Sequence, residues 1–191
     1  MSSQVKTFLT PEEYLALERK ADYRSEYFNG EIFAMTGASR RHNLIAVNIT
    51  REFSQQLKGR PCEVYASDMR VKVAATGLYT YPDIVVVCRE PKLEDNRFDT
   101  LLNPTLLVEI LSKSTAGYDR GEKFEHYRKL PPLAEYLLIA QDKHHVEHYA
   151  RQPDNQWLLS ETNDSQATID LPSIACRLML ADVYDKVEMD G

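Results

Sequence analysis

Apolar and polar positions near the start of the chain form one capped segment followed by two alternating runs. The segment TPEEYLALERK is predicted to be a short helix, because Thr10 is an N-cap residue and Glu13 completes a capping box. Pro11 suits the first helical position, where its missing N–H costs no hydrogen bond. The next segment, YRSEYFNGEIFAM, alternates on both sides of Asn29–Gly30, the dipeptide most typical of a two-residue hairpin turn.

The predicted turn decides which residues of the hairpin face each other. Pairing Phe28 with Glu31 sets Glu26 opposite Phe33, so the two glutamates share one face. Two surface glutamates are the ordinary interpretation of this face, and a supporting role in an acidic site is the alternative.

A second helix is predicted from about residue 40 to residue 58, with Ser39 as its N-cap and Gly59 at its end. Its core-facing positions recur at spacings of three, four and seven, and they are His42, Ile45, Ala46, Ile49 and Phe53. A histidine at the end of such a stripe is more often a satisfied core residue than a catalytic one. Both interpretations of His42 stay open at this point.

Two later apolar strands each carry one acid. Residues 62–75 alternate in two pieces, which predicts a strand, a bend and a second strand. The segment YPDIVVVC predicts a strand entered through Pro82, and residues 105–111 predict the next strand after a polar loop. Successive strands joined by such a loop are expected to be antiparallel neighbours. This pairing would bring Asp83, at the start of one strand, beside Glu109, at the end of the other.

A crossover helix is predicted after these strands, N-capped by Ser114 or Thr115 and ending near residue 130. Residues at four-residue spacing line one ridge of this helix: Asp119, Lys123 and Tyr127. Residues 135–140 predict a short apolar strand, parallel to the preceding one because a right-handed crossover joins them. The helix is therefore expected to lie against the sheet close to Glu109.

The remainder of the chain predicts a hairpin, a closing strand and a short helix, with Trp157 as a packing residue. Together the elements predict an α+β fold (mixed α/β) with a mixed central β-sheet flanked by helices. We expect a single domain over 1–191, with an N-terminal helix and hairpin at 8–36, a core at about 39–141 and closing elements at 142–191.

Composition limits the classes of function. A chain of 191 residues is large enough for one substantial core. A net charge of −6 argues against strong non-specific binding to nucleic acid, although local basic clusters leave room for a focused groove. Neither a signal peptide nor an apolar run of membrane-spanning length is recognised, so we expect no membrane partner.

The three cysteines, Cys62, Cys88 and Cys176, are far apart in the sequence, and none belongs to a CxxC pair. This spacing supports neither a zinc ribbon nor a disulfide framework. A reducing cytoplasm is therefore the expected location.

The candidate chemistry centres on Asp83 and Glu109, which lie in aliphatic runs. An ionised group there costs several kcal/mol unless a cation or hydrogen bonds compensate. A divalent-metal site is one hypothesis, and a buried ion pair is the other. Lys123 either serves this site or forms an exposed i,i+4 pair with Asp119.

With Pro82–Asp83, Glu109 and Lys123 placed, the sequence resembles the PD-(D/E)XK nuclease superfamily. Within that superfamily it looks like the Uma-type family of restriction endonucleases, formerly a domain of unknown function. The matching pieces, in order, are YFNGEIFAMTGAS, RRHN, YPDIVVV, VEILSKSTAGYDRGEKFEHYRKLPPLAEYLL and a late WLL. The resemblance covers about Thr10 to Val187.

The resemblance implies a restriction-endonuclease-like core and Mg²⁺-dependent cleavage of phosphodiester bonds in DNA, with Mn²⁺ as a substitute. Asp83 corresponds to the motif aspartate and Glu109 to the second acid. The superfamily places a lysine two positions after that acid, where this chain has Leu111, so the resemblance assigns the lysine role to Lys123. His42 occupies a helix position where relatives often carry an acid.

The chemistry of Mg²⁺ suggests how such a site would work. The ion prefers oxygen ligands in near-octahedral geometry, so Asp83, Glu109 and the backbone carbonyl of Ile110 form the expected ligand set. Lys123 would orient the attacking water or stabilise the transition state.

Three function hypotheses follow. The first is a metal-dependent DNA endonuclease, expected to be a homodimer because two copies related by a two-fold axis can cut both strands. The second is a catalytically degenerate nuclease fold that binds nucleic acid or a protein. The third is hydrolysis of a small phosphodiester by a metal bound to Glu26, Glu31, Asp83 and Glu109. Glu31 or His42 could also recruit a second ion in the first hypothesis.

Overall fold

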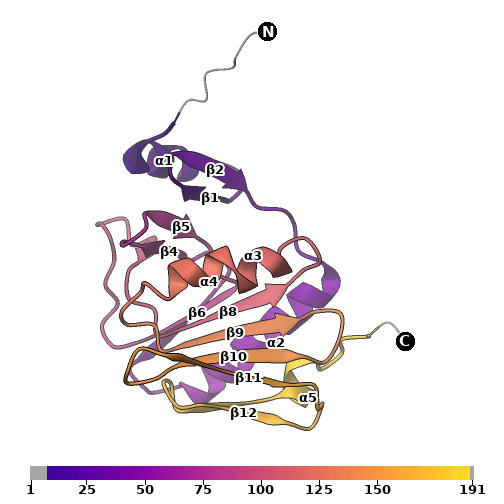
Figure 1. The fold of residues 1–191 in the computed structure, drawn as a ribbon. Coiled ribbons are helices and arrows are strands. Elements are labelled where there is room, and N and C mark those ends of the chain that lie inside the picture. Colours follow the sequence, from indigo (N-terminus) through magenta and orange to yellow (C-terminus); the bar gives the residue numbers. More distant parts are fainter. Residues whose placement is uncertain (1–7, 190–191) are drawn as a thin grey trace.

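The computed structural model describes residues 8–189, which form a mixed α+β architecture built on a central six-stranded sheet (Figure 1). The strand order is β11–β10–β9–β8–β6–β3, and β8 and β9 are its one parallel pair in the described residues. The bounds are β3 Cys62–Ala66, β6 Ile84–Cys88, β8 Leu106–Leu111, β9 Glu135–Ala140, β10 Val146–Arg151 and β11 Trp157–Thr162. The predicted fold class, with a mixed central sheet flanked by helices, is confirmed.

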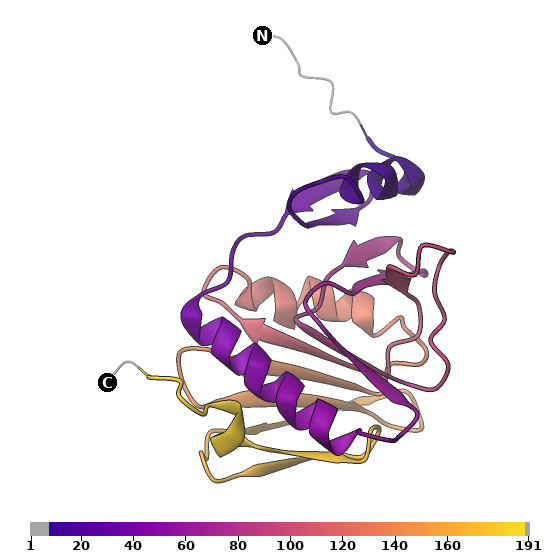
Figure 2. The same ribbon diagram turned by 180° about the vertical axis from the view of Figure 1, so that it is seen from behind.

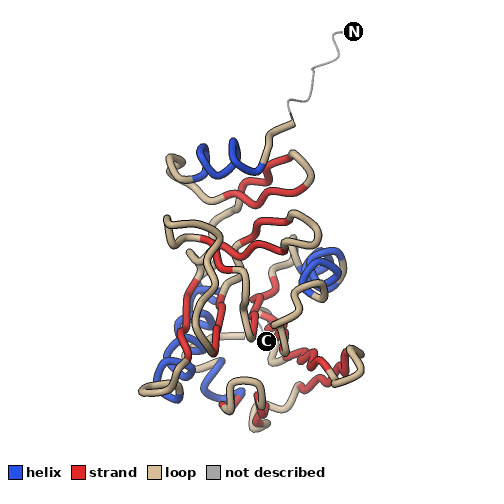
Figure 3. The backbone as a smooth tube through the Cα atoms, turned by 90° about the vertical axis from the view of Figure 1, so that its left-hand side faces the viewer, coloured by secondary structure: helices blue, strands red, loops and turns tan. Residues whose placement is uncertain are grey.

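Helices cover both faces of the central sheet. Helix α2 (Arg40–Gln56) lies across one face (Figure 2), whereas α3 (Ala116–Arg120) and α4 (Glu122–Tyr127) lie on the other (Figure 1). Seen from the side, the central strands lie between these two groups of helices (Figure 3). Helices α3 and α4 are short, and α2 is apolar along one face only. Packing against the sheet therefore supplies most of the stability of each helix.

The alternation of β8 decides which helix each of its residues meets. Val108 and Ile110 belong to the core on the α2 side, whereas Leu107 and Leu111 belong to the core on the α4 side. Because side chains of a strand alternate between faces, Glu109 points toward α4. Because of this alternation, Glu109 faces the helix that contains Lys123.

The N-terminal unit consists of α1 (Pro11–Glu18) and the hairpin that follows it, and both lie at the top of Figure 1. The capping box of α1 is present with both of its hydrogen bonds. The hairpin joins a five-stranded sheet in the order β2–β1–β5–β4–β7. Its strands are β1 Ser25–Phe28, β2 Glu31–Ala34, β4 Arg70–Val73, β5 Leu78–Thr80 and β7 Thr100–Leu101.

The predicted hairpin register is confirmed. Phe28 pairs with Glu31 and Glu26 pairs with Phe33. Asn29 and Gly30 have φ angles of 49° and 86°, the left-handed conformation that a tight hairpin turn requires. The sequence-local turn chemistry is therefore sufficient to set the pairing here.

The C-terminal elements close the core on the α2 side. Strands β12 (Thr168–Leu171) and β13 (Cys176–Met179) form a separate antiparallel ribbon that leads into α5 (Leu180–Val183). Their apolar side chains belong to the same core as those of α2. The closing strand thus pairs with its own neighbour instead of extending the central sheet.

The predicted crossover helix is not continuous, which corrects one expectation from the sequence. It is divided into α3 and α4 at Gly121, whose φ and ψ are both −101°. The Gly121 N–H donates to the carbonyls of Gly117 and Tyr118, which ends α3, and its own carbonyl accepts from Glu125 to begin α4. The expected side-chain N-cap at Thr115 is also missing, since its hydroxyl makes no capping hydrogen bond.

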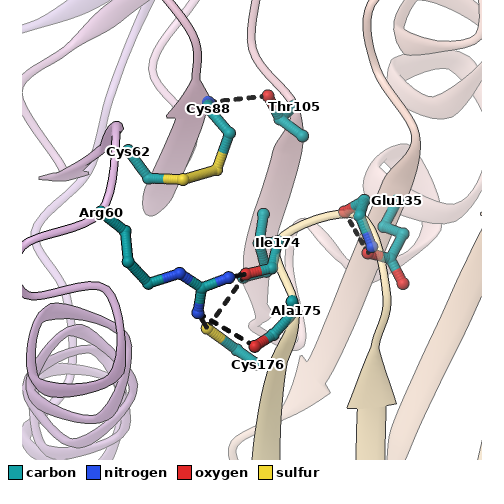
Figure 4. Close-up of a disulfide and its surroundings, with 9 residues drawn as sticks. Arg60, Cys62, Cys88, Thr105, Glu135, Ile174, Ala175 and Cys176 are labelled. Atoms are coloured by element: carbon teal, nitrogen blue, oxygen red, sulfur yellow. Dashed lines mark hydrogen bonds between the residues drawn. A yellow bond between two sulfur atoms is a disulfide. The ribbon is translucent and has the colours of Figure 1, made fainter.

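The expectation that the chain has no disulfide is wrong. Cys62 and Cys88 are joined by one (Figure 4), because the antiparallel pairing of β3 with β6 sets them directly opposite each other with Cα atoms 4.0 Å apart. Cys176 is a buried free thiol on β13, near Arg60. The argument for a reducing compartment from cysteine spacing therefore loses its basis.

Within residues 8–189, no helix combines the length and the apolar character needed to cross a bilayer. The longest of the described helices, α2, has 17 residues and belongs to the sheet-covering layer.

Candidate active site

The antiparallel pairing of β6 and β8 brings the two predicted acids to the same place. Ile84 pairs with Val108, so Asp83 and Glu109 are the next opposed positions at this end of the ladder. The Oδ2 atom of Asp83 accepts a hydrogen bond of 2.7 Å from the backbone N–H of Ile110. The backbone of β8, the strand that carries Glu109, thus fixes the orientation of the Asp83 carboxylate.

His42 reaches this pair from the start of α2. Ser39 is the N-cap, as predicted, and its hydroxyl accepts the backbone N–H of His42. The imidazole Nε2 lies 2.9 Å from Oδ1 of Asp83, and both side chains are 17% exposed. His42 is therefore in contact with the candidate site and not an isolated member of the helix core.

Lys123 lies among three carboxylates on the α4 side of the sheet. Its Nζ is 2.8 Å from Oε1 of Glu109 and 3.1 Å from Oε1 of Glu26. The third contact, to Oδ1 of Asp119, is 3.7 Å. The i,i+4 pair with Asp119 thus exists, but the lysine side chain is only 6% exposed and its nearest partner is Glu109. The interpretation of Lys123 as an exposed surface pair is wrong.

Two hydroxyl groups that the sequence did not identify as site members hold the carboxylates in place. The phenol of Tyr127 donates a 2.7 Å hydrogen bond to Oε1 of Glu109, the oxygen that also contacts Lys123. Thr80 donates to Oε1 of Glu26. The four-residue spacing of Tyr127 from Lys123 was a usable signal, whereas nothing in the sequence around Thr80 pointed to this contact.

The hairpin supplies one acid to the cluster. Glu26 on β1 contacts Lys123, although it is distant from Lys123 in the sequence. Glu31 lies on the same hairpin face beside the turn, where it pairs with Phe28. Glu26 thus connects the hairpin to the predicted lysine.

Burial and mutual attraction set the protonation of the cluster. The pKa of Glu109 lies well above its ordinary value because the carboxyl group is buried, and the attraction of Lys123 does not offset this effect. Burial acts to lower the pKa of Lys123, but the surrounding carboxylates outweigh burial and raise it well above its ordinary value. The pKa of Asp119 is also raised, mainly by burial. Protonated Lys123 is therefore the stable form of the lysine in this cluster.

The donor set is rich in negative charge. Four carboxylates share one ammonium group and one imidazole, and these groups are Glu26, Asp83, Glu109, Asp119, Lys123 and His42. With all four acids ionised, the excess of negative charge is relieved either by proton uptake or by a bound cation. Carboxylate oxygens are the ligands that Mg²⁺ prefers, so the residues present fit this ion by type.

Within the described residues, no three His, Cys, Asp or Glu side chains are arranged to hold a metal ion by themselves. The set that fits Mg²⁺ is two carboxylates completed by a backbone oxygen and water, since this ion usually retains several waters.

Comparisons with known proteins agree with this architecture. A family model described as "Uma2: Putative restriction endonuclease" matches residues 11–181. Two proteins of Synechocystis sp. (strain ATCC 27184 / PCC 6803 / Kazusa) are similar along most of their length. "Uncharacterized protein sll1609" is 43% identical over 162 residues, which cover 85% of this chain and 92% of that protein. "Uncharacterized protein slr1290" is 36% identical over 176 residues, which cover 92% of this chain and 91% of that protein.

A solved structure shares the fold. It is the crystal structure of a "putative nuclease belonging to DUF820" from Anabaena variabilis ATCC 29413, with a TM-score of 0.78 over 94% of this chain and 99% of that chain. At 21% sequence identity, the likeness concerns the fold alone. The restriction-endonuclease-like architecture expected from the sequence is thus confirmed.

Proposed function

We propose that this chain, which belongs to the Uma2 family of restriction endonucleases, hydrolyses phosphodiester bonds in DNA at the Asp83–Glu109–Lys123 cluster in a metal-dependent reaction. Membership of this family supports a nuclease activity in general. The DNA substrate, the metal ion and the role of each residue are what we propose in addition. The observation that carries it is the contact of a buried ammonium group, Lys123 Nζ, with Glu109 Oε1 at 2.8 Å, beside Asp83 on the neighbouring strand.

The proposed metal ligands are the carboxylates of Asp83 and Glu109 and the backbone carbonyl of Ile110, with Mg²⁺ as the ion and Mn²⁺ as a substitute. When bound, the ion would polarise the scissile phosphate and lower the pKa of the attacking water. His42 holds one carboxylate oxygen of Asp83, which restricts the rotation of that side chain.

The chain's own groups would orient the reactants and balance the charge. Lys123 presents a fixed positive charge that can hold the attacking water or stabilise the additional negative charge of the transition state. Glu26 and Asp119 keep the ammonium group protonated and in position. Tyr127 donates to the same oxygen of Glu109 that Lys123 contacts, which restricts the rotation of this carboxylate. In this account the residues around the lysine position the lysine and take no part in bond breaking.

Nicking of supercoiled plasmid DNA tests the proposal. We expect Mg²⁺- or Mn²⁺-dependent nicking by the wild-type protein. The nicking rate should fall by about 100-fold or more in the isosteric variants Asp83→Asn and Glu109→Gln, because each substitution removes a proposed metal ligand. Glu122→Gln is the matched control, because Glu122 is an exposed acid on α4 and should leave the rate unchanged. Equal cutting by the wild type and Asp83→Asn would indicate a contaminating nuclease and sink the assignment.

The degenerate-fold hypothesis predicts a different pattern. It expects DNA binding without cutting by every variant, with or without metal. If no protein cuts DNA but calorimetry shows Mn²⁺ binding that is lost in Glu109→Gln, the metal ligands are right and the substrate is wrong.

The proposed assembly is a homodimer, since two copies related by a two-fold axis present one site to each strand of a duplex. Light scattering on the purified chain would then give twice the monomer mass, and linear plasmid would appear early beside the nicked form. A monomer that produces only nicked plasmid would rule out this part of the proposal.

A further inference from the structure

A pocket of about 600 Å³ opens beside the candidate active site, at the edge of the sheet where β8 and β9 end. Four segments line it: the first residues of α2, the end of β8 with the residues just after it, both ends of α3, and the end of β9 with the turn that follows. Gln141 joins two of these walls, because its side chain contacts the Ser39 hydroxyl and donates to the carbonyl of Leu111. The pocket is therefore built from segments that the central sheet holds together.

The lining is strongly cationic in a chain whose net charge is −6. It contains five basic residues, Arg40, Arg41, Lys113, Arg120 and Lys143, and one acid, Asp142. Such a local reversal of charge attracts anions to this place and away from the acidic remainder of the surface.

The two lysines are the basic groups most available to a ligand. Lys113 and Lys143 are exposed and form no ion pair with the described residues. Arg120 is paired with Glu147 at 2.6 Å, and Arg40 lies 3.8 Å from the highly exposed Glu188. The pocket therefore offers at least two uncompensated charges, from two different elements, to a ligand.

The start of α2 adds to this preference. Its first turn contains no acidic residue and carries two arginines, although the N-terminal end of a helix favours negative charge. The two arginines thus add to the positive potential at this end of the helix.

Residues that line the pocket are close neighbours, along their own elements, of residues in the candidate catalytic cluster. Ser39 caps the helix turn that carries His42, and Arg120 follows Asp119 in the chain. A strand rises about 3.3 Å per residue, so Leu111 in the pocket wall lies roughly 6.6 Å from Glu109. Successive phosphates of one DNA strand advance by about 3.4 Å along the duplex axis. The pocket is therefore close enough to the cluster to hold another phosphate of the strand that is being cut.

We propose that this pocket is a subsite that binds a non-scissile phosphate of duplex DNA, with Lys113 and Lys143 as its principal contacts, and the inference rests on the proposed nuclease function. In this proposal Lys113, which lies beyond the end of β8 and is exposed, binds DNA and does not take the place of the motif lysine in the cluster. The subsite supplies affinity and register but no sequence specificity, since phosphates carry no base information.

The test measures DNA binding separately from cutting. Fluorescence anisotropy with a labelled duplex oligonucleotide is recorded in Ca²⁺ on the Asp83→Asn background, with and without Lys113→Ala and Lys143→Ala. We expect binding to weaken by about tenfold and the slope of log K against log salt to fall by about one to two, as for the loss of one or two phosphate contacts. Lys58→Ala with Lys92→Ala is the matched control, because both lysines are exposed and lie outside the pocket.

The outcomes separate this inference from the proposed function. Unchanged affinity and salt slope in the pocket variant, while the wild type still cuts DNA, would overturn the subsite and leave the nuclease assignment standing. Weakened binding in that variant alone, with no cutting by any protein, would support the subsite and count against the nuclease. Tight binding of inorganic phosphate at the pocket without any loss of duplex binding in the variant would also overturn the DNA assignment. Both lysines are exposed, so thermal melting should confirm that the variants fold.

Discussion

Lys123 shows how a single side chain can be costly and useful in the same place. Its ammonium group is buried and lies within 3.7 Å of three carboxylates. Removing one partner from a buried ion cluster leaves the other charges without compensation, which typically costs about 3–5 kcal/mol. The lysine therefore supports the fold of the cluster as well as its proposed chemistry.

We predict that Lys123→Met lowers the free energy of unfolding by about 3–5 kcal/mol and abolishes nicking. Urea titration followed by circular dichroism measures the first effect, and plasmid nicking measures the second. Lys129→Met is the matched control, since Lys129 is exposed just beyond α4 and should change stability by less than about 0.5 kcal/mol. A Lys123→Met protein with the same free energy of unfolding as the wild type would show that the ammonium group does not stabilise the folded state.

If Asp83 and Glu109 bind Mg²⁺, the ion should stabilise the folded protein. At a Mg²⁺ concentration about 100-fold above the dissociation constant, a ligand that binds only the folded state adds about 2.7 kcal/mol. We therefore expect the melting temperature of the wild type to rise with Mg²⁺ and that of Asp83→Asn to stay constant. Differential scanning calorimetry with and without a chelator measures this difference, and an equal rise in both proteins would place the ion elsewhere.

At the scale of elements, the break between α3 and α4 sets the geometry of the site. Gly121 ends one helix and starts the next, so Asp119 and Lys123 come from different helices and still contact each other, while Lys123 also contacts Glu109. A Cβ atom at Gly121 would lie 3.1 Å from the carbonyl oxygen of Gly117, closer than an ordinary contact. The absence of a side chain is thus part of how the two helices meet.

We predict that Gly121→Ala destabilises the protein by about 1 kcal/mol or more and slows nicking, because the added methyl group moves α4 and its lysine. Gly117→Ala is the matched control, since a Cβ there would meet nothing within 4 Å. It should be neutral or stabilising by up to about 1 kcal/mol, as expected for alanine in a helix. Chemical denaturation of the two variants checks the prediction, and the reverse order of stability would contradict it.

At the scale of the whole molecule, a buried polar network attaches the N-terminal unit to the rest. Arg70 on β4 donates to Thr100 at 3.0 Å and to the phenol of Tyr81 at 2.7 Å. Tyr81 in turn donates to Glu18 at the end of α1. Because the hairpin after α1 carries Glu26 to Lys123, this attachment also completes the candidate site.

The same attachment predicts how stability depends on pH. Arg19 donates to both carboxylate oxygens of Asp99, and this contact holds the pKa of Asp99 well below its ordinary value of 3.8. A carboxyl group whose pKa is lowered on folding stabilises the folded state above its ordinary pKa, and this contribution is lost as the pH falls through the folded value. Asp95 is shifted in the same direction, mainly by its hydrogen bond with Arg19.

We therefore expect the free energy of unfolding of the wild type to approach that of Asp99→Asn as the pH is lowered below about 4. Above that pH the variant should be the less stable protein. Urea titrations across the acidic range measure the difference between the two, which removes contributions from the other acids. Asp154→Asn, an exposed residue of the β10–β11 turn, serves as the control, and a difference that is independent of pH would contradict the assignment.

Local sequence was enough to predict much of the scaffold. The Asn29–Gly30 turn determines the hairpin register, and the Ser39 cap determines where α2 begins. These features depend on neighbouring residues, whose geometry is set by the chain itself. The antiparallel approach of Asp83 and Glu109 was also predictable, because strands that follow each other in the sequence are usually neighbours in a sheet.

What only the tertiary structure decided are the contacts between distant elements. The Cys62–Cys88 disulfide, the approach of Glu26 to Lys123 and the pocket around Lys113 all join segments that have no periodic relation in the sequence. Periodicity records which face of an element is buried, but it does not record which other element covers that face or how closely the side chains meet. The amino-acid sequence by itself thus determined the acids and the strands that carry them, and the packing of α4 and the hairpin against the sheet decided that Lys123 contacts both Glu109 and Glu26.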